Sequence, residues 1–177
     1  MKLVVSALDD VAEMVRRHRP DAIVSLLSPD QPAPAVAGRA PRVVLRFHDI
    51  ATPHQGLTAP DAGVVARLLE FGGARSAGET LLLHCWMGIS RSPAAAFILA
   101  CAAAPTTPEG EIAWALRRAA PAATPNPLLV SLADRHLARR GRMVSAISQI
   151  GRGCEAALGA PFELDTDAFE SRSWGAS

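Results

Sequence analysis

Several residue types are scarce or absent in this chain of 177 residues, and each absence narrows what the protein can be. It has no tyrosine, and Lys2 is its only lysine, so arginine supplies nearly all of its positive charge. Cysteine occurs only at Cys85, Cys101 and Cys154, an odd number at wide spacings and without a CxxC pair. These spacings argue against a disulfide framework and against a zinc site, and they favour a reducing compartment.

A large excess of one charge sign and long apolar runs are lacking too. The formal net charge is +1, so no field over the whole protein attracts nucleic acid or an anionic membrane. The N-terminus carries acidic residues soon after a short apolar run, unlike a signal peptide. The Ala-rich stretch from Pro93 to Ala104 is too short to span a membrane. We therefore expect a cytoplasmic protein with no nucleic-acid or membrane partner.

What is present is an alternation of strand and helix patterns. Hydrophobic residues make up 49% of the chain and charged residues 20%, which excludes wholesale disorder and permits one domain with its own core. Short apolar runs predict strands at residues 2–6, 22–27, 42–47 and 80–84. Helical spacing predicts one helix after Asp9 or Asp10 and another after Asp61, and then helices near residues 93–103, 109–119, 127–140 and 143–150. This order predicts an α/β fold, with a central, mostly parallel sheet of four or five strands flanked by helices and a helical C-terminal half.

The strongest chemical feature is the segment His84–Ser92, which reads HCWMGISRS. A buried strand leads directly into Cys85, five residues separate Cys85 from Arg91, and a helix begins there. The free N–H groups and the dipole at a helix N-terminus favour the thiolate form of a cysteine. Successive amides in such a loop can also form a nest for phosphate oxygens. The residues that would supply these amides are Trp86, Met87, Gly88, Ile89, Ser90 and Arg91.

Three residues of this segment have side-chain properties that suit the same chemistry. Arg91 offers a planar guanidinium that matches two phosphate oxygens. Gly88 permits a backbone conformation that a side chain would obstruct. Ser92 can donate a hydrogen bond to the sulfur and ease its departure when a phosphocysteine breaks down.

The segment resembles the HCxxGxxR[ST] signature of the cysteine-dependent protein tyrosine phosphatases, and the chain is most similar to compact bacterial dual-specificity-like members. The resemblance extends over about residues 22–140, because Pro125 and Asn126 with the leucines that follow are similar to an element near the end of those domains. It implies that Cys85 attacks phosphorus, that Arg91 and the loop amides hold the phosphate, and that His84 supports the loop. It also implies that no metal or organic cofactor is needed and that phosphate, sulfate or vanadate binds in the loop.

The resemblance further implies a general acid, an aspartate on a loop after an earlier strand. Asp49 lies 36 residues before Cys85, just after the strand predicted at 42–47, and such an acid protonates the leaving oxygen. Asp61 is the rival, but it precedes a predicted helix and is typical of an N-cap. Asn126 is interpreted as another N-cap. The Trp-Pro-Asp form of the acid loop is absent, so the classical tyrosine phosphatases are a poorer match.

We predict a cysteine phosphatase domain over residues 1–153 and an irregular C-terminal tail over 154–177, where periodicity is lost. The expected function is hydrolysis of phosphate monoesters through a phosphocysteine intermediate. Phosphotyrosine, phosphoserine and phosphothreonine in proteins are the favoured substrates, because the loop lacks the lysines with which lipid and inositol phosphatases of the superfamily hold extra phosphates. Cys101 is expected in the core.

Four alternatives remain open. The same loop chemistry serves an inositol phosphate, an RNA 5′-phosphate or another small ester as substrate. The chain could instead be an inactive phosphate-binding module. Arsenate reduction and sulfur transfer also use cysteine loops of this kind. Finally, Cys154 could act as a resolving thiol for an oxidised Cys85, although nothing in the sequence places the two together.

Overall fold

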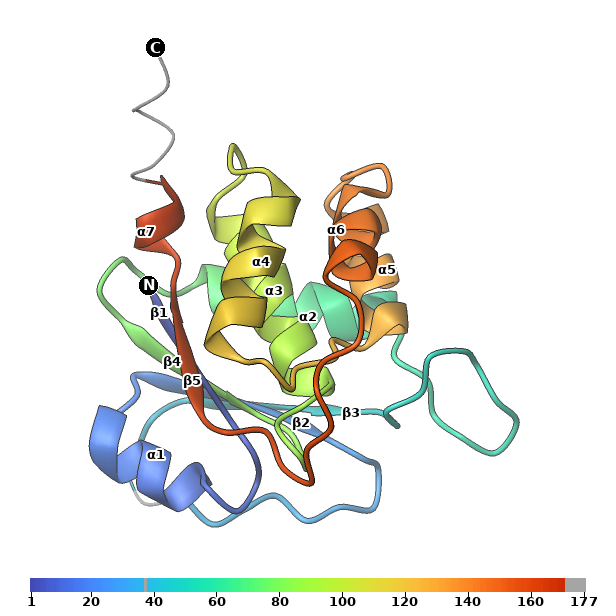
Figure 1. Ribbon diagram of the computed structural model, residues 1–177. Helices are drawn as coiled ribbons and strands as arrows, with labels where there is room; N and C mark the ends of the chain where they lie inside the picture. The colour runs from blue at the N-terminus through green and yellow to red at the C-terminus, as the bar shows by residue number, and fades with distance from the viewer. Residues whose placement is uncertain (37, 171–177) are drawn as a thin grey trace.

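The computed structural model describes residues 1–36 and 38–170 and consists of one sheet with helices on both of its faces (Figure 1). The strands are β1 (Lys2–Ser6), β2 (Ala22–Leu27), β3 (Arg42–Arg46), β4 (Thr80–His84) and β5 (Phe162–Asp165). The helices are α1 (Val11–His18), α2 (Ala62–Gly73), α3 (Arg91–Ala103), α4 (Glu109–Ala119), α5 (Pro127–His136), α6 (Arg142–Ile150) and α7 (Asp167–Glu170).

The five strands are arranged in the order β3-β2-β4-β1-β5. The first four run parallel to one another, and β5 alone is antiparallel to its neighbour β1. The predicted α/β fold with a mostly parallel sheet is therefore confirmed. The central strand β4 is buried on both faces, which explains its continuous apolar sequence.

The two faces of the sheet have cores of unequal size. Leu3 and Val5 of β1 point to the larger core under α2 to α6, whereas Val4 points to a smaller cluster with Val11 and Met14 of α1. Side chains alternate along a strand, so a single short strand contributes to both cores. Figure 1 shows α1 on one side of the sheet and α2 to α6 on the other.

Helix α3 lies at the centre of the larger core and is buried from Arg91 to Cys101. Helix α2 packs closely against it at Gly72, where an added Cβ would lie 2.3 Å from a methyl carbon of Leu99. Cys101 is in the core, as expected. In the part of the chain that the structure describes, no helix has both the length and the apolarity needed to cross a bilayer.

The parallel arrangement brings three loops to one edge of the sheet. Strands β2, β3 and β4 are neighbours and point the same way, so the segments that follow them emerge together. These segments carry Ser28 after β2, Asp49 after β3 and Cys85 after β4. Residues far apart in sequence thereby meet beside the N-terminus of α3.

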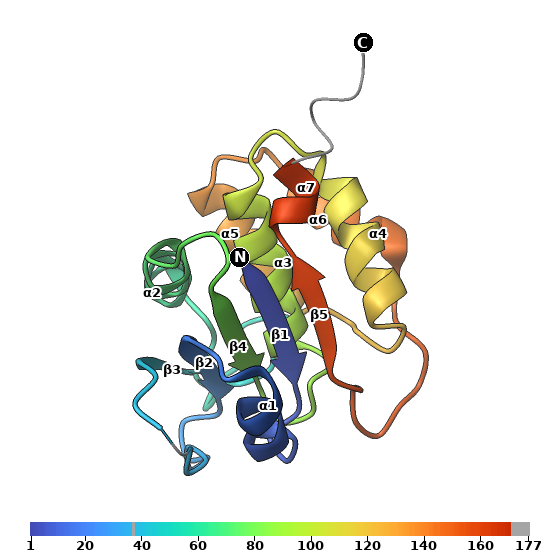
Figure 2. The ribbon, with the colours of Figure 1, turned by 90° about the vertical axis from the view of Figure 1, so that its left-hand side faces the viewer.

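The expectation of an irregular tail from residue 154 onward is wrong for Phe162–Glu170. Strand β5 extends the sheet by pairing with β1 (Figure 2). Phe162 and Leu164 are buried, while Glu163 is exposed. Four residues are too few for a clear alternation signal, and the pairing partner lies at the other end of the chain. Residues 171–177, which belong to the same expectation, lie outside the described residues.

Candidate active site

The loop of residues 85–90, between β4 and α3, has its carbonyl groups bonded to the surrounding protein. Four of these oxygens, those of Trp86, Met87, Ile89 and Ser90, accept backbone N–H groups at 2.8–3.3 Å from Leu8, Gly159, Thr124 and Asn126 respectively. Within the described residues, the N–H groups of residues 86–90 donate to no protein acceptor. A loop with bonded carbonyls and free amides next to a helix N-terminus is suited to binding an anion.

Gly88 is required by the way this loop packs on the end of β1. Its φ of +69° lies in the left-handed region, and an added Cβ would be only 2.8 Å from the backbone nitrogen of Ala7 and 3.0 Å from the carbonyl carbon of Ser6. Any other residue would both strain the backbone and collide with it. The glycine of the signature thus sets the shape of the loop.

Cys85 lies at the base of the loop with only 2% of its surface exposed. The hydroxyl of Ser92, in the first turn of α3, donates to its Sγ atom at 3.1 Å. The predicted proximity of these two side chains is confirmed. A hydroxyl at this distance can stabilise a thiolate by hydrogen bonding. It does not protonate the sulfur, because an alcohol is a much weaker acid than a thiol.

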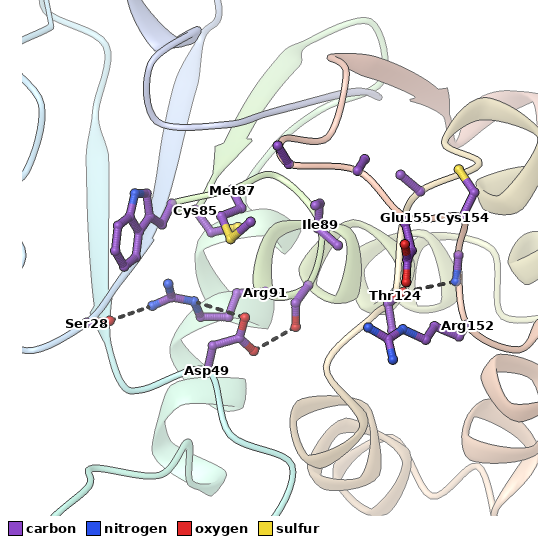
Figure 3. Close-up of a pocket in the computed structure, with 16 residues that line it drawn as sticks. Ser28, Asp49, Cys85, Met87, Ile89, Arg91, Thr124, Arg152, Cys154 and Glu155 are labelled. Atoms are coloured by element: carbon purple, nitrogen blue, oxygen red, sulfur yellow. Dashed lines mark hydrogen bonds and ion pairs between the residues drawn. The ribbon is translucent and has the colours of Figure 1, made fainter.

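Arg91 is 3% exposed, and its guanidinium lies beside Cys85 (Figure 3). Its Nη1 donates to the carbonyl of Phe47 at 3.1 Å and to the Ser28 hydroxyl at 3.3 Å. Its Nε is buried, and no described residue offers it a hydrogen-bond acceptor. A buried donor of this kind matches an oxygen of a bound oxyanion, as expected for a phosphate-binding arginine.

Asp49 is brought to the same site from the loop after β3. Its Oδ1 accepts two hydrogen bonds of 2.7 Å, from the Ser90 hydroxyl and from Nδ2 of Asn126. Its Oδ2 lies 3.9 Å from Nε of Arg91 and accepts no hydrogen bond within the described residues. The side chain is 35% exposed, so it can reach a ligand in the cleft. One carboxylate oxygen is anchored, and the other faces the Arg91 guanidinium.

Asn126 has a second function that the sequence did not reveal. It caps α5 as predicted, with Oδ1 accepting from the N–H of Leu129 at 2.9 Å. Its Nδ2 also donates to Asp49 and, at 3.1 Å, to the carbonyl of Ile50. The cap therefore also holds the loop that carries Asp49. No local signal could have shown this, because a cap is recognised from its own helix alone.

The rival residue, Asp61, does not reach the site. It is the N-cap of α2, where its Oδ1 accepts from the N–H of Val64 at 2.8 Å. The N-cap interpretation is confirmed. Asp61 is also absent from the residues that line the cleft around Cys85.

His84 is fully buried behind the loop, and its hydrogen bond goes to the sheet. Its Nε2 lies 2.7 Å from the hydroxyl of Ser25 on β2, which in turn accepts from Nε of Arg42 on β3 at 2.8 Å. Burial, assisted by the positive charge of Arg42, lowers the pKa of His84 to about 3. The imidazole is therefore neutral at physiological pH. Through these bonds His84 links β4 to β2 and β3 at the position directly before Cys85.

A cleft of about 820 Å³ opens above Cys85. On one side it has Trp86 and Met87, which are 61% and 42% exposed and give the loop an apolar rim. On the other side it has residues 152–157, which the sequence had assigned in large part to an irregular tail. Cys154 belongs to this side and has a free thiol. No three metal-ligating side chains gather anywhere in residues 1–36 and 38–170.

No protein-family model matches the sequence, and no curated protein matches it. Solved structures do match its fold. Human DUSP28 is 18% identical, with a TM-score of 0.57 over 78% of this chain and 92% of its own. DUSP15 is 16% identical, with a TM-score of 0.59 over 84% and 89%. A mouse putative dual specificity phosphatase, complexed with zinc tungstate, is 17% identical, with a TM-score of 0.55 over 82% and 86%. The chain has the dual-specificity phosphatase fold.

The neutral, buried state of His84 predicts a pH dependence of stability. The unfolded chain binds a proton near pH 6.5 and the folded chain only near pH 3, so stability falls as pH drops below 6.5. Between pH 6.5 and pH 5 we expect a loss of about 2 kcal/mol from this group. Urea unfolding of the wild type and of His84→Gln at both pH values measures this loss. In the variant, the free energy of unfolding should change less between the two pH values, because the contribution of His84 is gone.

The matched control is His136→Gln, because His136 is exposed at the end of α5. This variant should keep the wild-type dependence. An equal slope in wild type and His84→Gln would assign the pH dependence to other groups.

Proposed function

We propose that this protein is a cysteine-dependent phosphatase that hydrolyses phosphate monoesters through a phosphocysteine intermediate. The observation that carries the proposal is the convergence of four groups in one cleft: the Cys85 sulfur, the free loop amides, the buried guanidinium of Arg91 and the carboxyl of Asp49. The dual-specificity phosphatase fold is consistent with it.

In the first step the Cys85 thiolate attacks phosphorus and the bond to the leaving oxygen breaks. The three other phosphate oxygens accept hydrogen bonds from the loop amides and from Arg91. These donors are already oriented toward the place where negative charge must be held. Asp49 gives its proton to the leaving oxygen, so that an alcohol or phenol departs. The free Oδ2 is the oxygen suited to carry this proton, because Oδ1 is already an acceptor of two hydrogen bonds.

In the second step water attacks the phosphocysteine. Asp49, now ionised, accepts a proton from the water, and the bond between phosphorus and sulfur breaks to release inorganic phosphate. The Ser92 hydroxyl, 3.1 Å from Sγ, stabilises the sulfur as it regains its negative charge. Covalent catalysis thereby divides one difficult displacement into two easier ones.

Phosphorylated residues in proteins are the substrates that the cleft suits best. The exposed side chains of Trp86 and Met87 adjoin the nucleophile and can pack on the apolar part of a phosphotyrosine, phosphothreonine or phosphoserine side chain. The cleft contains two arginines, Arg91 and Arg152, but also two carboxylates, Asp49 and Glu155. This balance disfavours densely phosphorylated ligands.

The nucleophile is tested by Cys85→Ser. We expect turnover of p-nitrophenyl phosphate to disappear, because a serine hydroxyl at this position does not ionise as a thiol does. Binding of vanadate or phosphate, measured by calorimetry, should persist, because the loop amides and Arg91 are unchanged. Turnover at a rate near that of the wild type would remove Cys85 from the mechanism.

The general acid is tested by Asp49→Asn. The loss in kcat/KM should be on the order of 10²–10⁴ for alkyl and phenyl phosphates, and much smaller for esters of acidic phenols, whose oxygen departs without a proton. The alkaline limb in the pH profile of kcat/KM should also disappear, because it reports the loss of the proton from Asp49. Asp61→Asn is the control and should behave as wild type, because asparagine also caps helices well. A lost limb in Asp61→Asn with an unchanged profile in Asp49→Asn would reverse the assignment.

A substrate panel decides among the alternatives. It contains phosphotyrosine, phosphoserine and phosphothreonine peptides, inositol phosphates and an RNA with a 5′-phosphate, all assayed by phosphate release. We expect kcat/KM to be highest for the peptides. A higher value for an inositol phosphate or the RNA would move the protein to that substrate class. Oxyanion binding without any turnover would favour a phosphate-binding module.

A further inference from the structure

The side of the cleft opposite to the apolar rim is formed by residues 152–157, which we call the C-terminal wall. This wall lies between α6 and β5, and it follows directly on a segment held by Arg117 of α4. The Arg117 guanidinium donates to the carbonyls of Gly151 at 2.7 Å and of Pro121 at 2.6 Å. One arginine thereby ties the start of the wall to the segment before α5.

Close backbone contacts fix the wall at both ends. At the first end, the N–H of Gly153 donates to the Thr124 hydroxyl at 3.0 Å, and a Cβ added at Gly153 would lie 2.4 Å from the carbonyl oxygen of Ala122. Beyond the other end, the N–H of Gly159 donates to the carbonyl of Met87 in the phosphate-binding loop at 2.8 Å. The wall is thus a defined part of the site.

Arg152 is the cationic residue of this wall. Its side chain is exposed and makes no hydrogen bond or ion pair within the described part of the chain. Figure 3 shows it extending from the wall toward the middle of the cleft, on the side opposite to Arg91. The backbone on either side of Arg152 is anchored, and the N–H groups of its guanidinium are free. Such an arginine is suited to bind an acidic group.

We propose that Arg152 binds a carboxylate of the substrate beside the scissile phosphate, so that the protein prefers phosphopeptides with an acidic residue next to the phosphorylated one. This inference rests on the proposed function. A peptide fits better than a polyphosphate, because the cleft combines an apolar rim with the carboxylates of Asp49 and Glu155. A single added carboxylate near Arg152 satisfies the free cation, whereas several phosphates would also face these two acids.

The experiment compares phosphotyrosine peptides that differ only in having Asp or Asn directly before or after the phosphorylated residue. For the wild type we expect kcat/KM to be about three- to tenfold higher for the better placed Asp peptide than for its Asn partner, the range of a partly exposed charge-assisted contact. Arg152→Gln should reduce this ratio to about one, and Arg152→Glu should invert it. Because each ratio is internal to one variant, a change in overall activity does not disturb it.

The matched control is Arg118→Gln, which removes the same charge from an exposed position of α4 that does not line this cleft. It should retain the wild-type ratio. A ratio near one in the wild type, or an equal ratio in Arg152→Gln, would overturn the inference. So would a larger effect of Arg152→Gln on a small bisphosphate ester than on the acidic peptide, since the group recognised would then be a phosphate.

Binding to the Cys85→Ser variant separates this inference from the proposed function. Calorimetry with the same peptide pair reports recognition without turnover. If the wild type hydrolyses nothing but Cys85→Ser still prefers the Asp peptide, and loses the preference on adding Arg152→Gln, the inference stands and the phosphatase assignment fails. If hydrolysis occurs without a preference in either assay, the phosphatase assignment stands and the inference fails.

Discussion

The site depends on the orientation of the peptide groups in the loop of residues 85–90. Four of its carbonyl oxygens accept from backbone donors in separate parts of the chain: Leu8 after β1, Thr124 and Asn126 before α5, and Gly159 before β5. Because the oxygens are thus bonded to the protein, the N–H groups are left for an anion. Their direction is set by the whole fold, so donors of this kind need little rearrangement when negative charge develops.

The same framework positions the Asp49 carboxyl relative to Cys85. Ser90 belongs to the loop and Asn126 caps α5, yet both donate to the same oxygen of Asp49. The backbone N–H of Asn126 also bonds to the carbonyl of Ser90 at 3.3 Å. The carboxyl group, the loop and the helix cap therefore form one hydrogen-bonded unit, in which a shift of any member alters the distance between Asp49 and Cys85.

Local signals were sufficient for much of the fold and for the core of the site. The signature from His84 to Ser92 combines a strand end, a glycine and a helix start within nine residues, so it could be recognised from sequence neighbours alone. The helix caps at Asp61 and Asn126 are equally local, because a cap is bonded three residues ahead. The parallel strands β2 and β4 were readable as continuous apolar runs, since both of their faces are covered.

Other features were decided by tertiary structure alone, because they join residues that no local pattern connects. The bond between Asn126 and Asp49 spans 77 positions, and that between Ser25 and His84 spans 59. Strand β5 depends on β1 at the opposite end of the chain. The sequence by itself determined which residues could perform phosphate chemistry. The fold determined which aspartate reaches them and that the segment around Arg152 forms one side of the cleft.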